Sequence, residues 1–205
     1  MASQAPAPRP VLPPAVEGPA FLSDGTQVWV RPVLATDRGL VGEFVERESL
    51  QAIEARYFPG IRFAGTPEAI ASPGDRLCLL VLGDRADQVI VLGVGEYARN
   101  RTAPDLAEVG FLVAGTHHGH GIASLLLARL ARAARGFGIL RFDARVRDEN
   151  PSMLEVFRES GLPYAEEQAD GEVHVLIPLS TELHPQGWTN GGSPGPLDRS
   201  GTAPA

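Results

Sequence analysis

One stretch, residues 107–135, constrains the fold of this chain more than any other, because a strand pattern gives way to a helix pattern within it. From Ala107 to Val113 apolar residues alternate with others, the period of two typical of a β-strand. Beyond Gly121 the apolar residues recur at helical spacing, at Ile122, Leu125, Leu126, Leu130 and Ala134. The sequence therefore predicts a strand that passes through a short turn into a long amphipathic helix.

The turn itself, His118-Gly119-His120-Gly121-Ile122-Ala123, places two glycines where that helix begins. The first N–H groups of a helix have no partner within the helix, and the positive end of the helix dipole adds to them. Glycine lets a ligand approach this backbone closely, because it carries no Cβ. The turn is thus typical of a cradle for a phosphate or a pyrophosphate.

Length and composition indicate the broad class of protein. The 205 residues are enough for one domain with tails, and the formal net charge of −7 provides no overall basic field for nucleic acid or an anionic membrane. No stretch has the length of a membrane span or the pattern of a signal peptide, so we expect a cytoplasmic protein, a monomer or homodimer. Cys78 is the only cysteine, and all 18 cationic residues are arginines, which excludes lysine-based catalysis by this chain.

Both ends of the sequence are rich in residues that disfavour regular structure. Residues 1–20 hold six prolines, and residues 183–205 are rich in Gly, Pro and Ser. We therefore expect a disordered Pro-rich arm, a folded domain over residues 21–182 and a disordered tail.

Within the domain, the pattern predicts strands at 27–33, 76–82, 89–97, 107–113 and 140–146, and two more around the turn 169–171. Helices are expected at about 36–45, 50–57, from 66, from 122 to 135 and from 151 to a glycine at 161. Three strands linked as hairpins cannot come from a repeated βαβ unit. The predicted class is α+β with a mixed sheet.

These elements and the turn resemble the GNAT acyltransferase superfamily. Its acyl-CoA-binding motif reads Gln/Arg-x-x-Gly-x-Gly/Ala at the start of a long helix, and here His118, Gly121 and Ala123 stand in register with it. The order of elements over about 24–180 is similar to the GNAT fold, which implies a mostly antiparallel sheet of six to seven strands with about four helices. The segments 24–37, 49–57, 92–97 and 150–158 resemble bacterial protein lysine acetyltransferase domains.

The resemblance implies a catalytic base. Acyl transfer to an amine needs the neutral amine, and a free lysine has a pKa near ~10.4, so a positioned carboxylate has to take its proton. Glu108 matches the position of the glutamate that serves as general base in lysine acetyltransferases. A strand carboxylate that simply faces solvent is the alternative interpretation, and Glu96, one strand earlier, is the reserve base.

The resemblance also implies a set of residues around acetyl-CoA or another short acyl-CoA. The strand would bind the pantetheine arm through its backbone, the turn would bind the pyrophosphate, Asn150 would either contact the cofactor or cap its helix, and Phe157 stands where many relatives have a tyrosine acid. The cofactor-binding residues expected are Phe111, Leu112, Val113, His118, Gly119, His120, Gly121, Ile122, Ala123, Asn150 and Phe157. His117, His118 and His120 could suggest a metal site, but no Cys or acidic partner lies at zinc spacing, so no metal is expected.

Four functions fit these features. The first is an acetyl-CoA-dependent N-acetyltransferase acting on a protein lysine, and a small-molecule amine acceptor is the second. The third is a non-catalytic acyl-CoA sensor or interaction module. The fourth is a dinucleotide-binding oxidoreductase, because Gly119-x-Gly121-x-x-Ser124 follows a strand and Asp143 lies about 20 residues further on.

Overall fold

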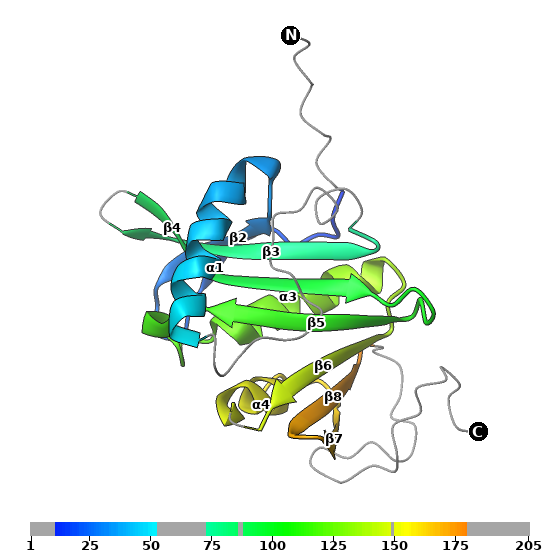
Figure 1. Ribbon diagram of the computed structural model, residues 1–205. Coiled ribbons are helices and arrows are strands. Elements are labelled where there is room, and N and C mark those ends of the chain that lie inside the picture. The colour runs from blue at the N-terminus through cyan, green and yellow to red at the C-terminus, as the bar shows by residue number, and fades with distance from the viewer. Residues whose placement is uncertain (1–10, 53–72, 86–87, 149, 180–205) are drawn as a thin grey trace, which may run out of the picture.

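Eight strands form a single sheet in the order β1-β2-β3-β4-β5-β6-β8-β7 in the computed structural model, which describes residues 11–52, 73–85, 88–148 and 150–179 (Figure 1). The strands are β1 (Gly18–Phe21), β2 (Gln27–Pro32), β3 (Arg76–Arg85), β4 (Gln88–Arg99), β5 (Leu106–Val113), β6 (Arg141–Arg147), β7 (Ala165–Ala169) and β8 (Glu172–Pro178). All neighbouring pairs are antiparallel except β5 with β6. The predicted mixed α+β class is confirmed, and the doubly wound parallel sheet of a dinucleotide-binding enzyme is excluded.

Three α-helices lie in the described ranges, together with two short 3₁₀ turns. They are α1 (Arg38–Ala52), α3 (Ile122–Gly136) and α4 (Pro151–Arg158), with η1 (Ala35–Asp37) and η2 (Gly115–His117). The helix expected at 50–57 is not separate at its start, because α1 runs on to Ala52. The remainder of that expected helix, and the one expected from residue 66, lie outside the described residues.

The N-terminal boundary of the fold differs from the expectation. Residues 18–20, expected at the end of a disordered arm, belong to β1, which pairs with β2. Val16 is fully buried, and Arg129 of α3 donates hydrogen bonds to the Ala15 and Pro19 carbonyls. The high proline content led to a wrong boundary, because local composition does not show that a distant arginine bonds to the backbone carbonyls of this segment. The last described residue, Leu179, also belongs to the core, and the expected tail lies outside the described residues.

The helices cover the two faces of the sheet unequally. On one face, α3 and α4 pack over the larger cluster of buried residues, which includes Phe111, Leu126 and Phe157. On the other face, α1 packs Val41 and Phe44 against a smaller cluster that lies over β3 to β5 (Figure 1). Residues on alternate positions of each strand therefore face different environments.

Two glycines of β4 set how closely α3 lies on the sheet. A Cβ on Gly93 would lie 2.6 Å from Ile122 Cγ2, and one on Gly95 would lie 3.1 Å from Leu126 Cβ. These positions tolerate no side chain because the helix occupies the space. The start of α3 is thus fixed against the middle of the sheet.

The sheet opens between β5 and β6. Their parallel pairing covers only residues 106–108 of β5 and 141–143 of β6, although the strands continue to Val113 and Arg147. Figure 1 shows the two strands diverging beyond this pairing. The opening lies at the carboxyl end of β5, directly before the glycine-rich turn and α3.

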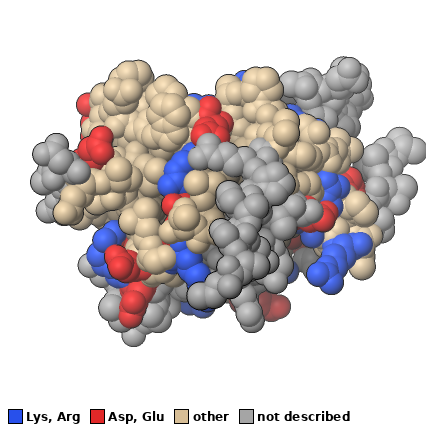
Figure 2. All heavy atoms as spheres, turned by 90° about the horizontal axis from the view of Figure 1, so that it is seen from above, with Lys and Arg blue, Asp and Glu red and all other residues tan. Residues whose placement is uncertain are grey.

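Charge is mixed over the surface in Figure 2, where blue and red side chains are interspersed on the face in view. Among the described helices, none is long and apolar enough to cross a membrane.

Candidate active site

The turn before α3 has the backbone conformation that only glycine adopts easily. Gly119 and Gly121 have φ of 78° and 82°, in the left-handed region, and a Cβ at either would meet no atom within 4 Å. The space over both residues is open to a ligand. The glycines are required by the backbone and leave the N–H groups accessible.

The first turn of α3 supplies the donors. Its first intrahelical hydrogen bond is the one that Leu125 N–H donates to the Gly121 carbonyl, at 2.9 Å. The N–H groups of Ile122, Ala123 and Ser124 therefore have no acceptor within the helix. Together with the helix dipole they form the anion-binding site that the sequence predicts.

The edge of β5 adds a second set of backbone groups. Ala114 N–H donates to the Leu92 carbonyl on the β4 side, at 2.9 Å. Alternation then directs the N–H and C=O groups of Phe111 and Val113 toward the opposite edge, where pairing with β6 has ended. This edge can bond an extended ligand arm as another strand would.

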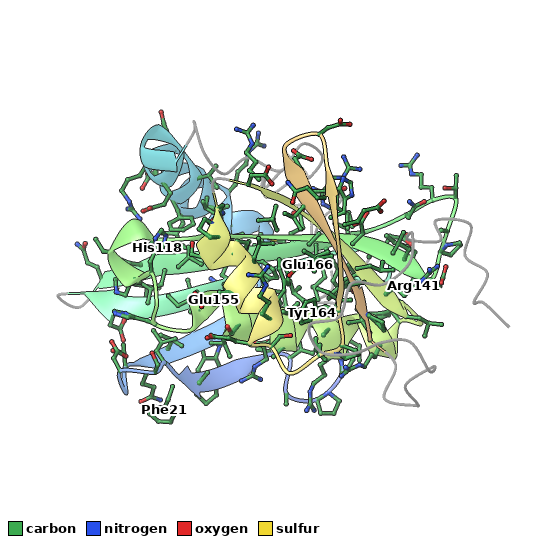
Figure 3. All side chains as sticks on the ribbon, turned by 90° about the horizontal axis from the view of Figure 1, so that it is seen from below. Phe21, His118, Arg141, Glu155, Tyr164 and Glu166 are labelled. Atoms are coloured by element: carbon green, nitrogen blue, oxygen red, sulfur yellow. The ribbon has the colours of Figure 1, made fainter. Side chains whose placement is uncertain are left out.

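A cavity of about 230 Å³ joins the strand edge and the turn. Nine of the predicted cofactor-binding residues line it: Phe111, Leu112, Val113, His118, Gly119, Gly121, Ile122, Ala123 and Asn150. His118, from the turn, and Glu155, from α4, both line it and are labelled in Figure 3. One cavity thus brings together segments that the sequence predicted separately.

His118 lines the cavity but bonds to the protein. Its Nε2 lies 3.1 Å from the Val113 carbonyl oxygen, and since a carbonyl only accepts, Nε2 carries the hydrogen. The imidazole therefore ties the turn back to the end of β5. The ring thus bonds to the strand, while the neighbouring glycines Gly119 and Gly121 line the cavity.

Two predicted cofactor residues do not line the cavity. The His120 ring lies 3.6 Å from an Asp24 carboxylate oxygen, and the His120 carbonyl accepts a hydrogen bond from Ser23 N–H, so this residue ties the turn to the β1–β2 connection. Phe157 is fully buried and packs against Phe111, with ring centroids 6.2 Å apart. Phe157 therefore supports the cavity from the core, whereas the half-exposed His120 side chain is held by its ion-pair contact with Asp24.

Asn150 occupies the N-cap position of α4, but its side chain does not cap the helix. It precedes Pro151, which occupies the first position of α4, but its side chain makes no capping hydrogen bond. Instead Asn150 Oδ1 accepts a bond from Ser152 Oγ at 2.9 Å, and the residue is buried at the cavity wall. The helix also ends earlier than expected, at Arg158, with Gly161 (φ 71°) beyond its C-cap Glu159.

One helix wall was missed by sequence reasoning. Four α4 residues line the cavity at helical spacing: Ser152, Met153, Glu155 and Val156. The α4 C-cap residue Glu159, His117 of η2 and Ser124 of α3 complete the lining. The spacing of these α4 positions could have indicated a common face. Nothing local to α4 indicates which ligand that face meets, since the cavity exists only once β5, α3 and α4 are assembled.

Glu108 lies on the other face of the sheet, toward α1. Its neighbours Ala107 and Val109 belong to the α3-side core, whereas Leu112 packs with the α1-side cluster, so alternation assigns Glu108 to the α1 side. Its register partner in β6 is Asp143, the last pair before the opening. Burial raises the pKa of the Glu108 carboxyl, Arg145 lowers it, and Asp143 raises it again.

Glu96 shares that face on the adjacent strand. It is fully buried and forms an ion pair with Arg76 through Oε1. Burial and, to a smaller extent, the charge of Glu108 raise its pKa to about 7, against the opposing effect of Arg76. The α1 face next to the opening thus carries two carboxyl groups with elevated pKa values, the property expected of a proton acceptor near neutral pH.

His117, His118 and His120 were considered above as possible metal ligands. Within the described ranges, no group of three or more His, Cys, Asp or Glu side chains is arranged to hold a metal ion.

Comparison with known proteins identifies the same acetyltransferase family by sequence and by structure. The family model described as "Acetyltransferase (GNAT) family" matches residues 47–162, more than half of the chain. Among solved structures, the GNAT domain of S. lividans PAT is similar with a TM-score of 0.67 and 28% identity, over 81% of this chain and 98% of that one.

Two mycobacterial structures share the fold at lower identity. Mycobacterium smegmatis RimJ in complex with CoA-disulfide has a TM-score of 0.60 at 21% identity, over 83% of this chain and 89% of that one. The cAMP-binding acyltransferase from M. smegmatis has a TM-score of 0.55 at 21% identity, over 80% of this chain and 47% of that one.

Proposed function

Because this chain belongs to the acetyltransferase (GNAT) family and is an acyl-CoA-dependent acyltransferase, we propose that it acetylates the ε-amino group of a protein lysine with Glu108 as general base. The observation that carries the proposal is the opening between β5 and β6, which leads to the glycine turn on one side and to Glu108 on the other. A thioester placed in that opening would be reached from both faces of the sheet.

Acetyl-CoA is bound by backbone groups in this scheme. The pyrophosphate lies at the N–H groups of Ile122, Ala123 and Ser124. The pantetheine arm bonds to the edge of β5 beyond its pairing with β6, at Phe111 and at the Val113 N–H, since the Val113 carbonyl accepts from His118. A backbone N–H on that edge can also polarise the thioester carbonyl as negative charge develops on its oxygen.

The chemical step needs one base near the opening. Glu108 takes a proton from the acceptor nitrogen, directly or through a water molecule, as that nitrogen forms a bond to the thioester carbon. The C–S bond then breaks, and CoA leaves as the thiolate, a good leaving group at neutral pH. Burial of Glu108, which raises its pKa, makes it a stronger base than an exposed carboxylate.

The charge on the α1 face of the sheet, beside the opening, favours a cationic acceptor. Glu96, Glu108 and Asp143 lie on this face around the opening. A lysine ammonium would be attracted to such a surface before it loses its proton. The similarity to the S. lividans PAT domain points in the same direction.

The test is Glu108→Gln, measured by two methods on one preparation. Calorimetry with acetyl-CoA, propionyl-CoA, CoA and NAD(H) reports binding, and mass spectrometry of lysine peptides, N-terminal amines and polyamines reports transfer. We expect unchanged acetyl-CoA affinity and a ~10²–10⁴-fold lower rate of lysine acetylation in Glu108→Gln.

A matched control is Glu166→Gln. Glu166 is also a strand glutamate, but it pairs with Arg158 of α4 at 2.8 Å, so both binding and rate should stay at native levels. Acetylation of polyamines but not peptides would replace lysine by a small amine. Binding of acetyl-CoA with no transfer to any amine would identify a sensor, and full activity in Glu108→Gln would remove Glu108 as the base.

A further inference from the structure

Glu96 and Glu108 are diagonal neighbours on one face of the sheet. In the β4–β5 register Glu96 is opposite Gly110 and Glu108 is opposite Ala98, so the two side chains are two positions apart on adjacent strands. Diagonal neighbours have Cα atoms ~7–8 Å apart, within reach for long side chains. Gly110 leaves the space beside Glu96 free of a side chain.

Each carboxyl group has a buried oxygen with no hydrogen-bond partner among the described residues. Arg76 donates to Glu96 Oε1, while Glu96 Oε2 and Glu108 Oε1 are buried and accept no hydrogen bond in the described part of the chain. A buried unpartnered carboxylate oxygen is costly unless it has a role or holds a proton. Two such oxygens on neighbouring strands need a common explanation.

The charges around the pair are asymmetric. Arg76 and Cys78 of β3 lie beside Glu96, and Asp143 and Arg145 of β6 lie beside Glu108. On α1, the buried Glu48 is already bonded to Gly115 N–H at 2.9 Å. Arg76 balances the charge of Glu96. On the Glu108 side, Glu108 and Asp143 carry two negative charges against the one positive charge of Arg145, so a cationic acceptor would make this side neutral.

We propose that Glu96 and Glu108 act as a carboxylate pair, in which Glu96 receives through Glu108 the first of the two protons that the acceptor nitrogen loses. This inference rests on the proposed function, since it deepens the role of the same site. Glu96 has no exposed surface, so it cannot contact the acceptor directly. It acts through Glu108 and is therefore a positioning residue, not a catalytic one.

The proton balance of the reaction requires two acceptors. An ammonium, R–NH₃⁺, becomes an amide N–H and so gives up two protons. Glu108 takes the first and passes it to Glu96, which returns Glu108 to its ionised form. The neutral amine then forms the C–N bond, Glu108 takes the second proton, and the C–S bond breaks to release CoA thiolate. Both protons leave to solvent after the products.

The direct test does not depend on knowing the acceptor. Protein labelled with ¹³C at the glutamate carboxyl carbons is titrated by NMR, and the signals of the pair are assigned by their loss in Glu96→Gln and Glu108→Gln. We expect the Glu96 signal to titrate near 7 in the native protein and at lower pH in Glu108→Gln, because the neighbouring negative charge is gone. An unchanged Glu96 titration in Glu108→Gln would overturn the pairing.

Kinetics test the transfer itself, with acetyl-CoA and the peptide or amine that the panel above identifies. The acid limb of log(kcat/KM) should fall with slope two in the native enzyme and slope one in Glu96→Gln, with kcat reduced ~10–100-fold and acetyl-CoA affinity unchanged. The double variant should be no slower than Glu108→Gln, since the residues act as a unit. A merely structural Glu96 would instead leave the slope at its native value.

Failure of this inference is distinct from failure of the proposed function. If Glu108→Gln is inactive while Glu96→Gln keeps native rate and slope, Glu108 is the base and the pair does not exist. If Glu108→Gln keeps full activity, the proposed base itself is wrong. Glu166→Gln serves again as the control, because its ion pair lies away from this face.

Discussion

The contact between Gly93 and the start of α3 makes Gly93→Ala a sharp test of how the core positions the cofactor cradle. The added Cβ would lie 2.6 Å from Ile122 Cγ2 and 3.4 Å from both the Leu112 carbonyl oxygen and Leu126 Cδ1. Ile122 is 1% exposed and β-branched, so its side chain cannot rotate away freely. Contacts between carbon atoms are favourable at ~3.5–4.0 Å, so the first turn of α3 has to move about 1 Å from the sheet.

The magnitude follows from two terms. Overpacking of a close-packed core costs about 1–3 kcal/mol, and in a domain of this size each kcal/mol lowers Tm by about 2–4 °C. The same displacement moves the Ile122 N–H away from the pyrophosphate. Loss of one hydrogen bond to a charged group costs about 1.5–3 kcal/mol, which corresponds to roughly 10- to 100-fold in the Kd of acetyl-CoA.

The assay pairs thermal unfolding with calorimetry, and Gly83→Ala is the control. A Cβ on Gly83 would lie 2.7 Å from Leu92 Cδ1, the end of a more flexible side chain that does not belong to the cradle. Gly83→Ala should lower Tm modestly and leave acetyl-CoA affinity unchanged. Native acetyl-CoA affinity in a destabilised Gly93→Ala, or an equal loss of affinity in both variants, would show that the contact of Gly93 with α3 does not position the cradle.

Two further predictions concern the cradle and the buried carboxyl. Gly121→Ala places a non-glycine residue at φ 82°, where the added Cβ meets no protein atom. We expect urea unfolding to show about 1–2 kcal/mol lower stability, and calorimetry to show a much higher Kd for acetyl-CoA. An unchanged Kd would contradict the cradle assignment. The Glu96 pKa is raised in the folded state from 4.5 to about 7, so its contribution to stability is greatest below pH 4.5 and is lost as pH rises to about 7. Relative to Glu96→Gln, the native protein should lose up to about 3 kcal/mol between pH 4.5 and 7.5, and parallel pH profiles of the two proteins would contradict this.

The stretch 107–135 was predictable because its signals are local. Alternation along β5, the two glycines and the apolar face of α3 all act within a few residues of one another, and the structure has each in the expected place. The turn at Asp170 and Gly171 between the last two strands, with φ of 52° and 79°, was equally readable. Backbone conformation at such positions is dictated by residue type.

The N-terminal segment shows where composition fails. Residues 13 to 19 hold three prolines, yet the carbonyls of Pro14 and Pro19 accept hydrogen bonds from arginines of α3, more than 100 residues away. Helical spacing alone does not show what the side chains of these arginines bond to. Their role depends on which segment lies beside the helix, and that is settled only by packing.

The sequence by itself determined the strand, the glycine turn, the helix and the identity of the carboxylates, because each depends on side-chain periodicity or on conformations restricted to glycine. Only the tertiary structure decided that His120 and Phe157 lie away from the cavity, and that α4 forms one of its walls. It also placed Glu96 beside Glu108, since strand register brings together residues that lie 12 positions apart in the chain. Register, burial and the loss of hydrogen-bond partners arise from the assembled sheet, and no single segment encodes them.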